Sequence, residues 1–168
     1  MVARSDLPVL PGVTIRQATL ADAAQVSEVL LQAFAEFRPL YTVDGFAATT
    51  PGPNSVMRRM EEGPTWVGAL NGQIAGTTAA VDRGKEGLYV RGMAVIPAAR
   101  GHGIGESLLF EVERFARQSG CRRMFLSTTP FLTAAIRLYE RYGFARIPAG
   151  DGDLFGTPLV TMAKELNY

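Results

Sequence analysis

The first part of this chain shows a strand pattern of apolar and polar side chains, followed by a helical pattern. Residues 13–18 alternate, which predicts a first strand, and Thr19 with Asp22 resembles a capping box in which Asp replaces Glu or Gln. Residues 23–34 repeat apolar side chains at helical spacing, which predicts a helix that ends before Pro39. The side chains of its apolar face are Ala23, Val26, Val29, Leu30, Ala33 and Phe34.

Residues 38–55 show neither a helical nor a strand pattern, and a strand pattern returns from residue 65. Residues 38–55 predict a long irregular segment, of the kind that often shapes a functional site. A short helix over 55–62 and a strand over 65–70 follow. Asn71-Gly72, a strong two-residue hairpin signal, then joins this strand to another over 73–81.

Strands and helices alternate in the second half of the chain. The predicted elements are a strand over 88–95, a helix from Ile104 to Gly120, a strand over 122–128, a helix with Thr129 as its N-cap and Pro130 at its first position, and strands over 144–147 and 157–166. This order predicts an α/β fold whose mixed sheet carries helices on both faces. We expect a single domain over 13–168, preceded by a flexible lead-in over 1–12.

The composition restricts the classes of function. With 168 residues, a net charge of +1 and no basic run, the chain lacks a broad nucleic-acid footprint. No apolar run reaches about 18 residues, so we expect no membrane span, and the cytoplasm is the default location. The single cysteine, Cys121, and the single histidine, His102, argue against a disulfide framework and against a metal site.

The stretch from Val90 to Gly105 carries the candidate chemistry. It predicts a strand, a basic loop with three alternating glycines, and a helix whose first N–H groups have no intrahelical acceptor. Free N–H groups and the helix dipole favour an anion, and Arg100 adds a guanidinium that matches phosphate. Glu106 replaces the third glycine of a dinucleotide fingerprint and no Gly-Lys-Ser/Thr follows, which disfavours dinucleotides and triphosphates. A simple glycine turn before a helix is the alternative.

Two motifs resemble those of the GCN5-related N-acetyltransferase (GNAT) family. The string from Val95 to Gly105 reads Val-x-Pro-x-x-Arg-Gly-x-Gly-x-Gly, which contains the family's Arg/Gln-x-x-Gly-x-Gly/Ala signature. The string from Ala135 to Phe144 resembles the family's Ala-x-x-Leu-Tyr-x-x-x-Gly-Phe. The order of elements also agrees over nearly the whole chain. The resemblance implies a GNAT-like central mixed sheet of six to seven strands, flanked by about four helices on both faces.

The resemblance also implies a site for acetyl-CoA. The loop would hold the CoA pyrophosphate, and the preceding strand would pair with the pantetheine arm as if with an added strand. The implied cofactor-binding residues are Met93, Ala94, Val95, Arg100, Gly101, His102, Gly103, Ile104, Gly105 and Glu106, and no metal is implied. Gly92 fits a bulge that opens the sheet for this arm, with a close packing contact as the alternative.

Catalytic roles follow from the same resemblance. Tyr139 matches the family tyrosine that protonates the departing thiolate, and the Val95 N–H matches the donor to the oxyanion. Tyr142 is expected to pack. The family often has Asn where this chain has Leu132, so Thr129 or another nearby threonine, Thr133, is a candidate for the missing polar contact.

The sequence leaves the general base open. Residues 88–95 contain no carboxylate, which many family members have on this strand. Glu86, Asp82 and Asp44 are candidates that would act through water, or they are solvated turn charges. Arg91, the charge on this strand, would meet an acidic group of the acceptor or face solvent.

We therefore expect an acetyl-CoA-dependent N-acetyltransferase that transfers the acetyl group directly to an amine of a small molecule or peptide. The alternative is a non-catalytic acyl-CoA-binding sensor module, which the intact Tyr139 disfavours. Residues 37–56 and the loop near 150 are expected to shape the acceptor pocket, and Trp66 belongs either to its wall or to the core. A homodimer is left open, as is the use of an acyl group other than acetyl.

Overall fold

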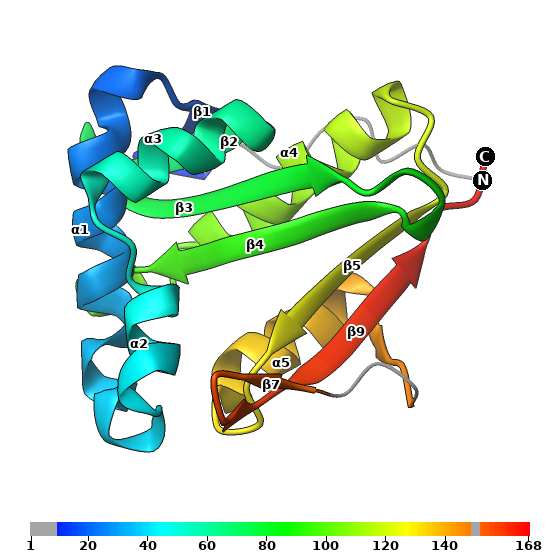
Figure 1. Cartoon of the computed structure of the whole chain (residues 1–168). Helices are drawn as coiled ribbons and strands as arrows, with labels where there is room; N and C mark the ends of the chain where they lie inside the picture. Colours follow the sequence, from blue (N-terminus) through cyan, green and yellow to red (C-terminus); the bar gives the residue numbers. More distant parts are fainter. Residues whose placement is uncertain (1–9, 149–151) are drawn as a thin grey trace.

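The computed structural model describes residues 10–148 and 152–168. The predicted lead-in over 1–12 therefore lies almost wholly outside the described residues, as does the centre of the loop near 150. Seven strands form one sheet in the order β1-β2-β3-β4-β5-β9-β6, and β7 and β8 form a separate two-stranded ribbon (Figure 1). The fold is the α/β architecture that the sequence predicts.

The elements have the following bounds. The strands are β1 Val13–Gln17, β2 Thr65–Leu70, β3 Gln73–Asp82, β4 Leu88–Val95, β5 Arg123–Thr128, β6 Ala145–Arg146, β7 Asp153–Leu154, β8 Thr157–Pro158 and β9 Val160–Glu165. The α-helices are α1 Ala23–Phe34, α2 Val43–Thr49, α3 Pro53–Glu62, α4 Ile104–Gln118 and α5 Thr133–Tyr142. Short 3-10 segments cover Leu20–Asp22, Ala35–Leu40, Gly84–Glu86 and Pro97–Ala99.

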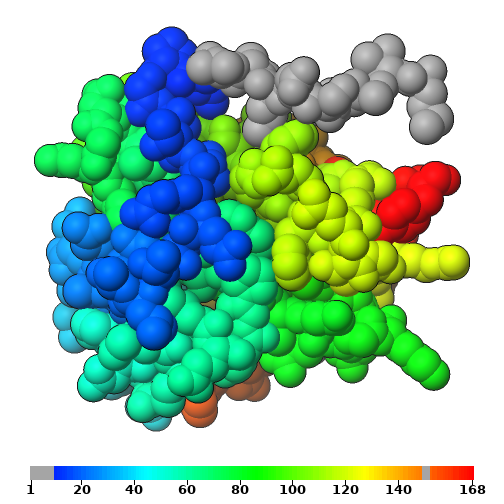
Figure 2. Space-filling model, turned by 90° about the horizontal axis from the view of Figure 1, so that it is seen from above, coloured from blue at the N-terminus to red at the C-terminus, as the bar shows by residue number. Residues whose placement is uncertain are grey.

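Helices cover both faces of the sheet, because each face carries its own apolar cluster. On one face α1 and α3 pack against Val67 and Ala94, and these helices appear as the adjoining blue and cyan surfaces of Figure 2. On the other face α4 and α5 pack against the sheet around Leu88, Met124 and Met162, all fully buried. No described helix has both the length and the apolar character needed to span a membrane.

The sheet opens between β4 and β5. These parallel strands pair only at Leu88 with Met124 and at Tyr89 with Phe125, and then diverge (Figure 1). Beyond this point β4 contains a bulge, where the register with β3 shifts between Thr77 and Ala79 and Gly92 has a φ of 62°. A Cβ at Gly92 would meet only Leu30, at 3.9 Å, so the backbone conformation and not a close packing contact requires glycine here. The predicted bulge is confirmed.

Three local predictions differ from the structure. Residues 38–55 are not irregular, because Thr42 Oγ1 accepts the Gly45 N–H at 3.0 Å and so caps α2. Thr129 does not cap a helix, since a turn closed by the Leu132 N–H on the Thr129 carbonyl precedes α5. The predicted final strand over 157–166 is also divided, into β8 and β9.

Candidate functional site

A cavity of about 680 Å³ occupies the opening between β4 and β5. Every cofactor-binding residue that the resemblance implies lines it except His102, and Tyr139 lines it from α5. His102 is exposed at the outer side of the loop, between two glycines with left-handed backbones. A cavity of this size lies in the range typical of small-molecule sites.

The loop before α4 has the geometry of an anion cradle. Gly101 and Gly103 have φ of 85° and 80°, a conformation that side chains with a Cβ rarely adopt. The Ser107 N–H bonds to the Gly103 carbonyl at 3.0 Å, so the N–H groups of the three residues before Ser107 have no intrahelical acceptor. These residues, Ile104, Gly105 and Glu106, line the cavity. Free N–H groups at a helix N-terminus favour a bound anion.

Arg100 connects the loop to the neighbouring elements. Its Nη1 lies 2.6 Å from Glu36 Oε1, and its Nη2 donates to the Ala33 carbonyl at 3.2 Å. Its Nε donates to the Val95 carbonyl at 3.4 Å. Arg100 lines the cavity, yet its guanidinium already contacts α1, the following 3-10 segment and β4.

The open edge of β4 presents unpaired backbone groups to the cavity. The Ile96 N–H donates to the Ala75 carbonyl at 2.9 Å, on the β3 side. Because successive residues of a strand point their N–H groups to opposite sides, the N–H groups of Val95 and Met93 point toward the opening. No strand of the described residues covers this side of β4 beyond Tyr89. An extended ligand arm can therefore add to β4 as a further strand.

Tyr139 is 5% exposed and packs edge-on against Phe144, with ring centroids 5.9 Å apart. Burial raises the pKa of Tyr139 well above its ordinary value, and the nearby Tyr41 raises this pKa further. The phenol is therefore protonated at neutral pH. Tyr142 does not line the cavity and instead packs under Lys164, whose Nζ lies 4.3 Å from the ring centroid.

An aromatic wall, made of Phe37, Tyr41 and Phe131, lines the cavity on the side of the 3-10 segment that follows α1. Tyr41 and Phe131 meet edge-on with centroids 4.9 Å apart, and Phe37 stacks on Phe131 at 6.3 Å. The sequence did not single out Phe37 or Phe131, because these residues follow no regular period. Trp66 is not part of this wall and packs in the core against Phe115.

Polar groups of the site differ from those that the sequence suggested. Thr129 and Thr133 both line the cavity, as does Leu132 at the position where the family often has Asn. The Thr129 hydroxyl is buried and makes no hydrogen bond of good geometry among the described residues, although it lies near the hydroxyl of Tyr41. Either threonine is placed to offer a polar contact to a bound ligand.

The three suggested bases lie outside the cavity. Asp44, Asp82 and Glu86 are exposed, and the Asp82 carboxylate accepts the Gly84 N–H at 2.8 Å within its turn. The phosphate loop, as we call residues 100–106, includes the first turn of α4, and Glu106 in that turn is the single carboxylate residue among the described residues that line the cavity. Asp82 and Glu86 are therefore solvated charges of the turn between β3 and β4, whereas Asp44 belongs to the first turn of helix α2 and not to a loop. Four arginines line the same cavity, namely Arg59, Arg91, Arg100 and Arg141.

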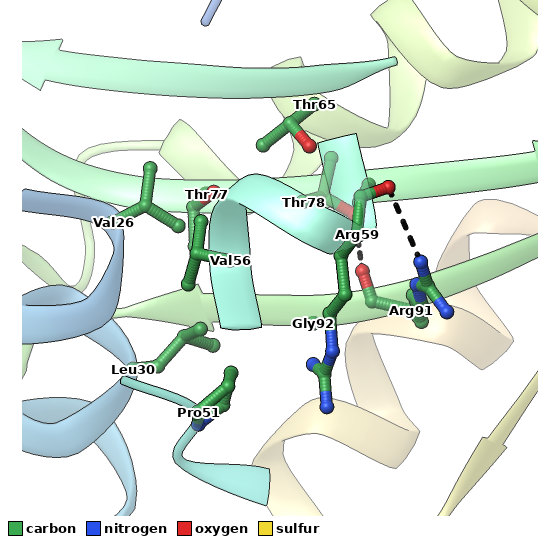
Figure 3. A pocket seen from close by; sticks show the side chains of 11 residues that line it. Val26, Leu30, Pro51, Val56, Arg59, Thr65, Thr77, Thr78, Arg91 and Gly92 are labelled. Atoms are coloured by element: carbon green, nitrogen blue, oxygen red, sulfur yellow. Dashed lines mark hydrogen bonds between the residues drawn. The ribbon is translucent and has the colours of Figure 1, made fainter. Parts of the chain in front are cut away.

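Arg91 does not simply face solvent. Its side chain is 17% exposed, and its Nη2 lies 3.0 Å from Glu62 Oε2. Arg59, from α3, lines the cavity next to it and was not singled out from the sequence. Figure 3 shows both side chains beside Gly92 at a second cavity of about 20 Å³, which has room for little more than a water molecule.

Comparisons with known proteins agree with this geometry. Residues 30–144 match the model of the acetyltransferase (GNAT) family. The uncharacterised N-acetyltransferase YjgM of Escherichia coli is 30% identical over 138 residues, which cover 79% of this chain and 82% of YjgM. The acetyltransferase Atu2258 of Agrobacterium fabrum is 40% identical over 79 residues, which cover 47% of this chain and 53% of that protein.

Solved structures share the fold. The structure of yncA from Salmonella typhimurium, an acetyltransferase with its cofactor acetyl-CoA, has a TM-score of 0.71 and 25% identity and covers 93% of this chain and 95% of that chain. An acetyltransferase of the GNAT family from Staphylococcus aureus has a TM-score of 0.76 at 20% identity and covers 92% of this chain and 99% of that chain.

Proposed function

Because this chain belongs to the acetyltransferase (GNAT) family and is an acetyl-CoA-dependent N-acetyltransferase, we propose that it transfers the acetyl group directly from acetyl-CoA to an amine held in the same cavity. One observation carries this proposal. The free N–H groups of the phosphate loop, the open edge of β4 and the Tyr139 side chain all line a single cavity of about 680 Å³.

The chain's residues fit acetyl-CoA at two places. The N–H groups of Ile104, Gly105 and Glu106 would hold the pyrophosphate at the N-terminus of α4. The backbone of Met93 and Val95 would pair with the pantetheine arm along the open edge of β4. These two anchors lie on consecutive segments of the chain, so one ligand can reach both.

The chemistry requires a donor to the thioester oxygen and an acid for the thiolate. Bound acetyl-CoA supplies an activated acetyl thioester. The Val95 N–H points into the opening and is the proposed hydrogen-bond donor to the thioester oxygen as negative charge develops there. Tyr139 is the proposed acid, because its buried phenol keeps its proton at neutral pH.

The ammonium form of the acceptor must lose a proton before it can attack. Glu106 is the one carboxylate residue of the described cavity lining, and it belongs to the phosphate loop. We therefore propose that the proton leaves through water and not through a carboxylate on β4. On this proposal kcat/KM for the amine rises about tenfold per pH unit below the amine pKa.

A thiol-release assay across amines, amino acids and peptides tests the proposal. We expect one CoA thiol per acetylated amine and initial-rate patterns of a ternary complex. A double-displacement pattern would contradict direct transfer. Tight acetyl-CoA binding without transfer to any amine would favour the sensor module instead. The location in the cytoplasm stays a prediction, and the formation of a homodimer stays open.

A further inference from the structure

Two arginines meet at the end of the cavity that lies away from the phosphate loop. Arg91 precedes the bulge on β4 and lies four positions before Val95, so it is on the far side of the bulge from the phosphate loop. Arg59 comes to this end from α3: its side chain runs past Gly92, and the Arg91 guanidinium lies at the Arg59 carbonyl (Figure 3). The thioester is proposed to lie at the Val95 N–H, between the phosphate loop and this pair of arginines.

The positive charge of this pair is only partly balanced. Arg91 forms an ion pair with Glu62, whose side chain is 51% exposed, while the buried Arg91 Nε has no hydrogen-bond partner among the described residues. Arg59 Nη2 donates to the Ala48 carbonyl at 2.8 Å, and Arg59 forms no ion pair within the described part of the chain. Burial lowers the pKa of Arg59, and the charge of Arg91 lowers it further.

Two half-buried guanidinium groups with a single, exposed carboxylate paired to one of them leave room for a second anion at this end of the cavity. Guanidinium groups bind carboxylates through paired hydrogen bonds, which fixes the orientation of the ligand as well as its charge. From the geometry we propose that the acceptor amine carries a carboxylate group, which binds Arg59 and Arg91 while the amine points toward Tyr139. This inference rests on the proposed function, because it names the class of acceptor for the same site.

The remaining walls agree with a small zwitterionic acceptor. The aromatic wall of Phe37, Tyr41 and Phe131 offers an apolar surface to the carbon skeleton. The two arginines line this end of the cavity, whereas Glu62, the carboxylate near them, is paired with Arg91 and is not among the described lining residues; this disfavours polycationic acceptors such as polyamines and aminoglycosides. The competing interpretation is structural, because the Arg91 Nη2 also donates to the Arg59 carbonyl and so fastens α3 to β4.

The experiment compares matched acceptors in the thiol-release assay. Each of a panel of amino acids is tested against its carboxamide, its decarboxylated amine and its aminophosphonate analogue. We expect kcat/KM for the best acid to exceed that for its carboxamide by 100-fold or more. The phosphonate arm distinguishes a carboxylate site from a general phosphate site, which would prefer the phosphonate. Equal rates for acid and carboxamide, or a preference for the phosphonate or for polyamines, would overturn the proposal.

Variants of the pair separate binding from folding. Arg59→Gln and Arg91→Gln should each raise KM for the acid 10- to 100-fold and leave the acetyl-CoA Kd unchanged. Arg58→Gln is the matched control, because Arg58 is exposed on α3 and donates to Ser55 Oγ. Glu62→Gln removes the competing carboxylate and should lower KM for the acid several-fold, a gain that a misfolded protein cannot give. An acid preference that survives both arginine variants would exclude this site.

A failure of catalysis can be told apart from a failure of this inference. If no amine is acetylated, binding of the same acids and carboxamides to the CoA-saturated protein is measured by calorimetry. Acid binding that Arg59→Gln and Arg91→Gln abolish would support the carboxylate site while the proposed transfer fails. Equal binding of acid and carboxamide would reject the site whatever the activity.

Discussion

Arg100 and Glu36 form an ion pair of 2.6 Å between residues that lie 64 positions apart in the sequence. This pair attaches the phosphate loop to the segment after α1, and Arg100 adds contacts to the carbonyls of Ala33 and Val95. The guanidinium therefore holds the loop in place from outside. The sequence had suggested direct contact between Arg100 and the phosphates, which stays a prediction.

The two roles of Arg100 predict opposite effects of Glu36→Gln on the binding of acetyl-CoA. If Arg100 positions the loop, as its contacts suggest, we expect the acetyl-CoA Kd to rise about 2- to 5-fold, less than 1 kcal/mol, as for an exposed ion pair. If Arg100 binds phosphate directly, the loss of the Glu36 carboxylate would free the guanidinium for the phosphate and lower the acetyl-CoA Kd. Titration calorimetry measures the difference. Glu111→Gln is the control, because the Glu111–Arg114 ion pair lies within α4 and neither residue lines the cavity.

Gly103→Ala should weaken acetyl-CoA binding by tenfold or more. Alanine at a φ of 80° is strained by about 1 kcal/mol, and relief of this strain turns the N–H groups of the loop away from the ligand. Gly120→Ala introduces alanine at a φ of 73° after α4, away from the cavity. It carries the same backbone strain in open space, whereas a Cβ at Gly103 must also displace the Leu10 side chain, so Gly120→Ala should cost no more stability in thermal unfolding and should leave the Kd unchanged. Equal Kd values for the two variants would reject the role of the loop.

Tyr139→Phe should lower kcat by about 10²- to 10⁴-fold, the usual contribution of a general acid, with little change in acetyl-CoA Kd. Tyr142→Phe is the control and should keep its kcat, because Tyr142 lies outside the cavity. The raised pKa of Tyr139 also means that ionisation of this phenol should not reduce wild-type activity between pH 7 and about pH 10. Unchanged thiol release by Tyr139→Phe would remove this residue as the acid.

Asp22→Asn should destabilise the protein at neutral pH and not in strong acid. The Asp22 carboxylate accepts hydrogen bonds from Arg16 at 2.7 and 2.9 Å, which, together with the Thr19 N–H, lower the pKa of Asp22 from 3.8 to about 2. A lowered pKa in the folded state stabilises it above pH 4, and this stability is lost as pH falls from about 4 to 2.

Because Arg16 is half exposed and water screens the pair, we expect Asp22→Asn to lower the free energy of unfolding by about 1 kcal/mol at pH 7. The difference from wild type should vanish near pH 2. Urea unfolding at both pH values provides the measurement. A difference that is equal at pH 7 and pH 2 would assign the effect to packing and not to charge.

Local features were determined by the sequence because their causes lie within a few residues. Asn71-Gly72 forms the predicted hairpin, since both residues adopt the positive φ that its turn needs. The glycines at 101 and 103 form the predicted loop for the same reason. The string from Ala135 to Phe144 places Tyr139 on the buried face of α5, because helical spacing fixes which side chains share a face.

Tertiary structure alone decided what surrounds the reacting groups. Thr42 caps α2 and also contacts Thr157, 115 positions away, so the order of residues 38–55 was not visible in their own pattern. Arg59 on α3 and Arg91 on β4 are 32 positions apart, and the fold brings Arg91 Nη2 to the Arg59 carbonyl. Only there does the charge of Arg91 lower the pKa of Arg59. Backbone preference acts between neighbours in the sequence, whereas charge and burial act between neighbours in space. The conformation of the cofactor loop could therefore be predicted from the sequence, while the residues at the acceptor end of the cavity could be identified only from the tertiary structure.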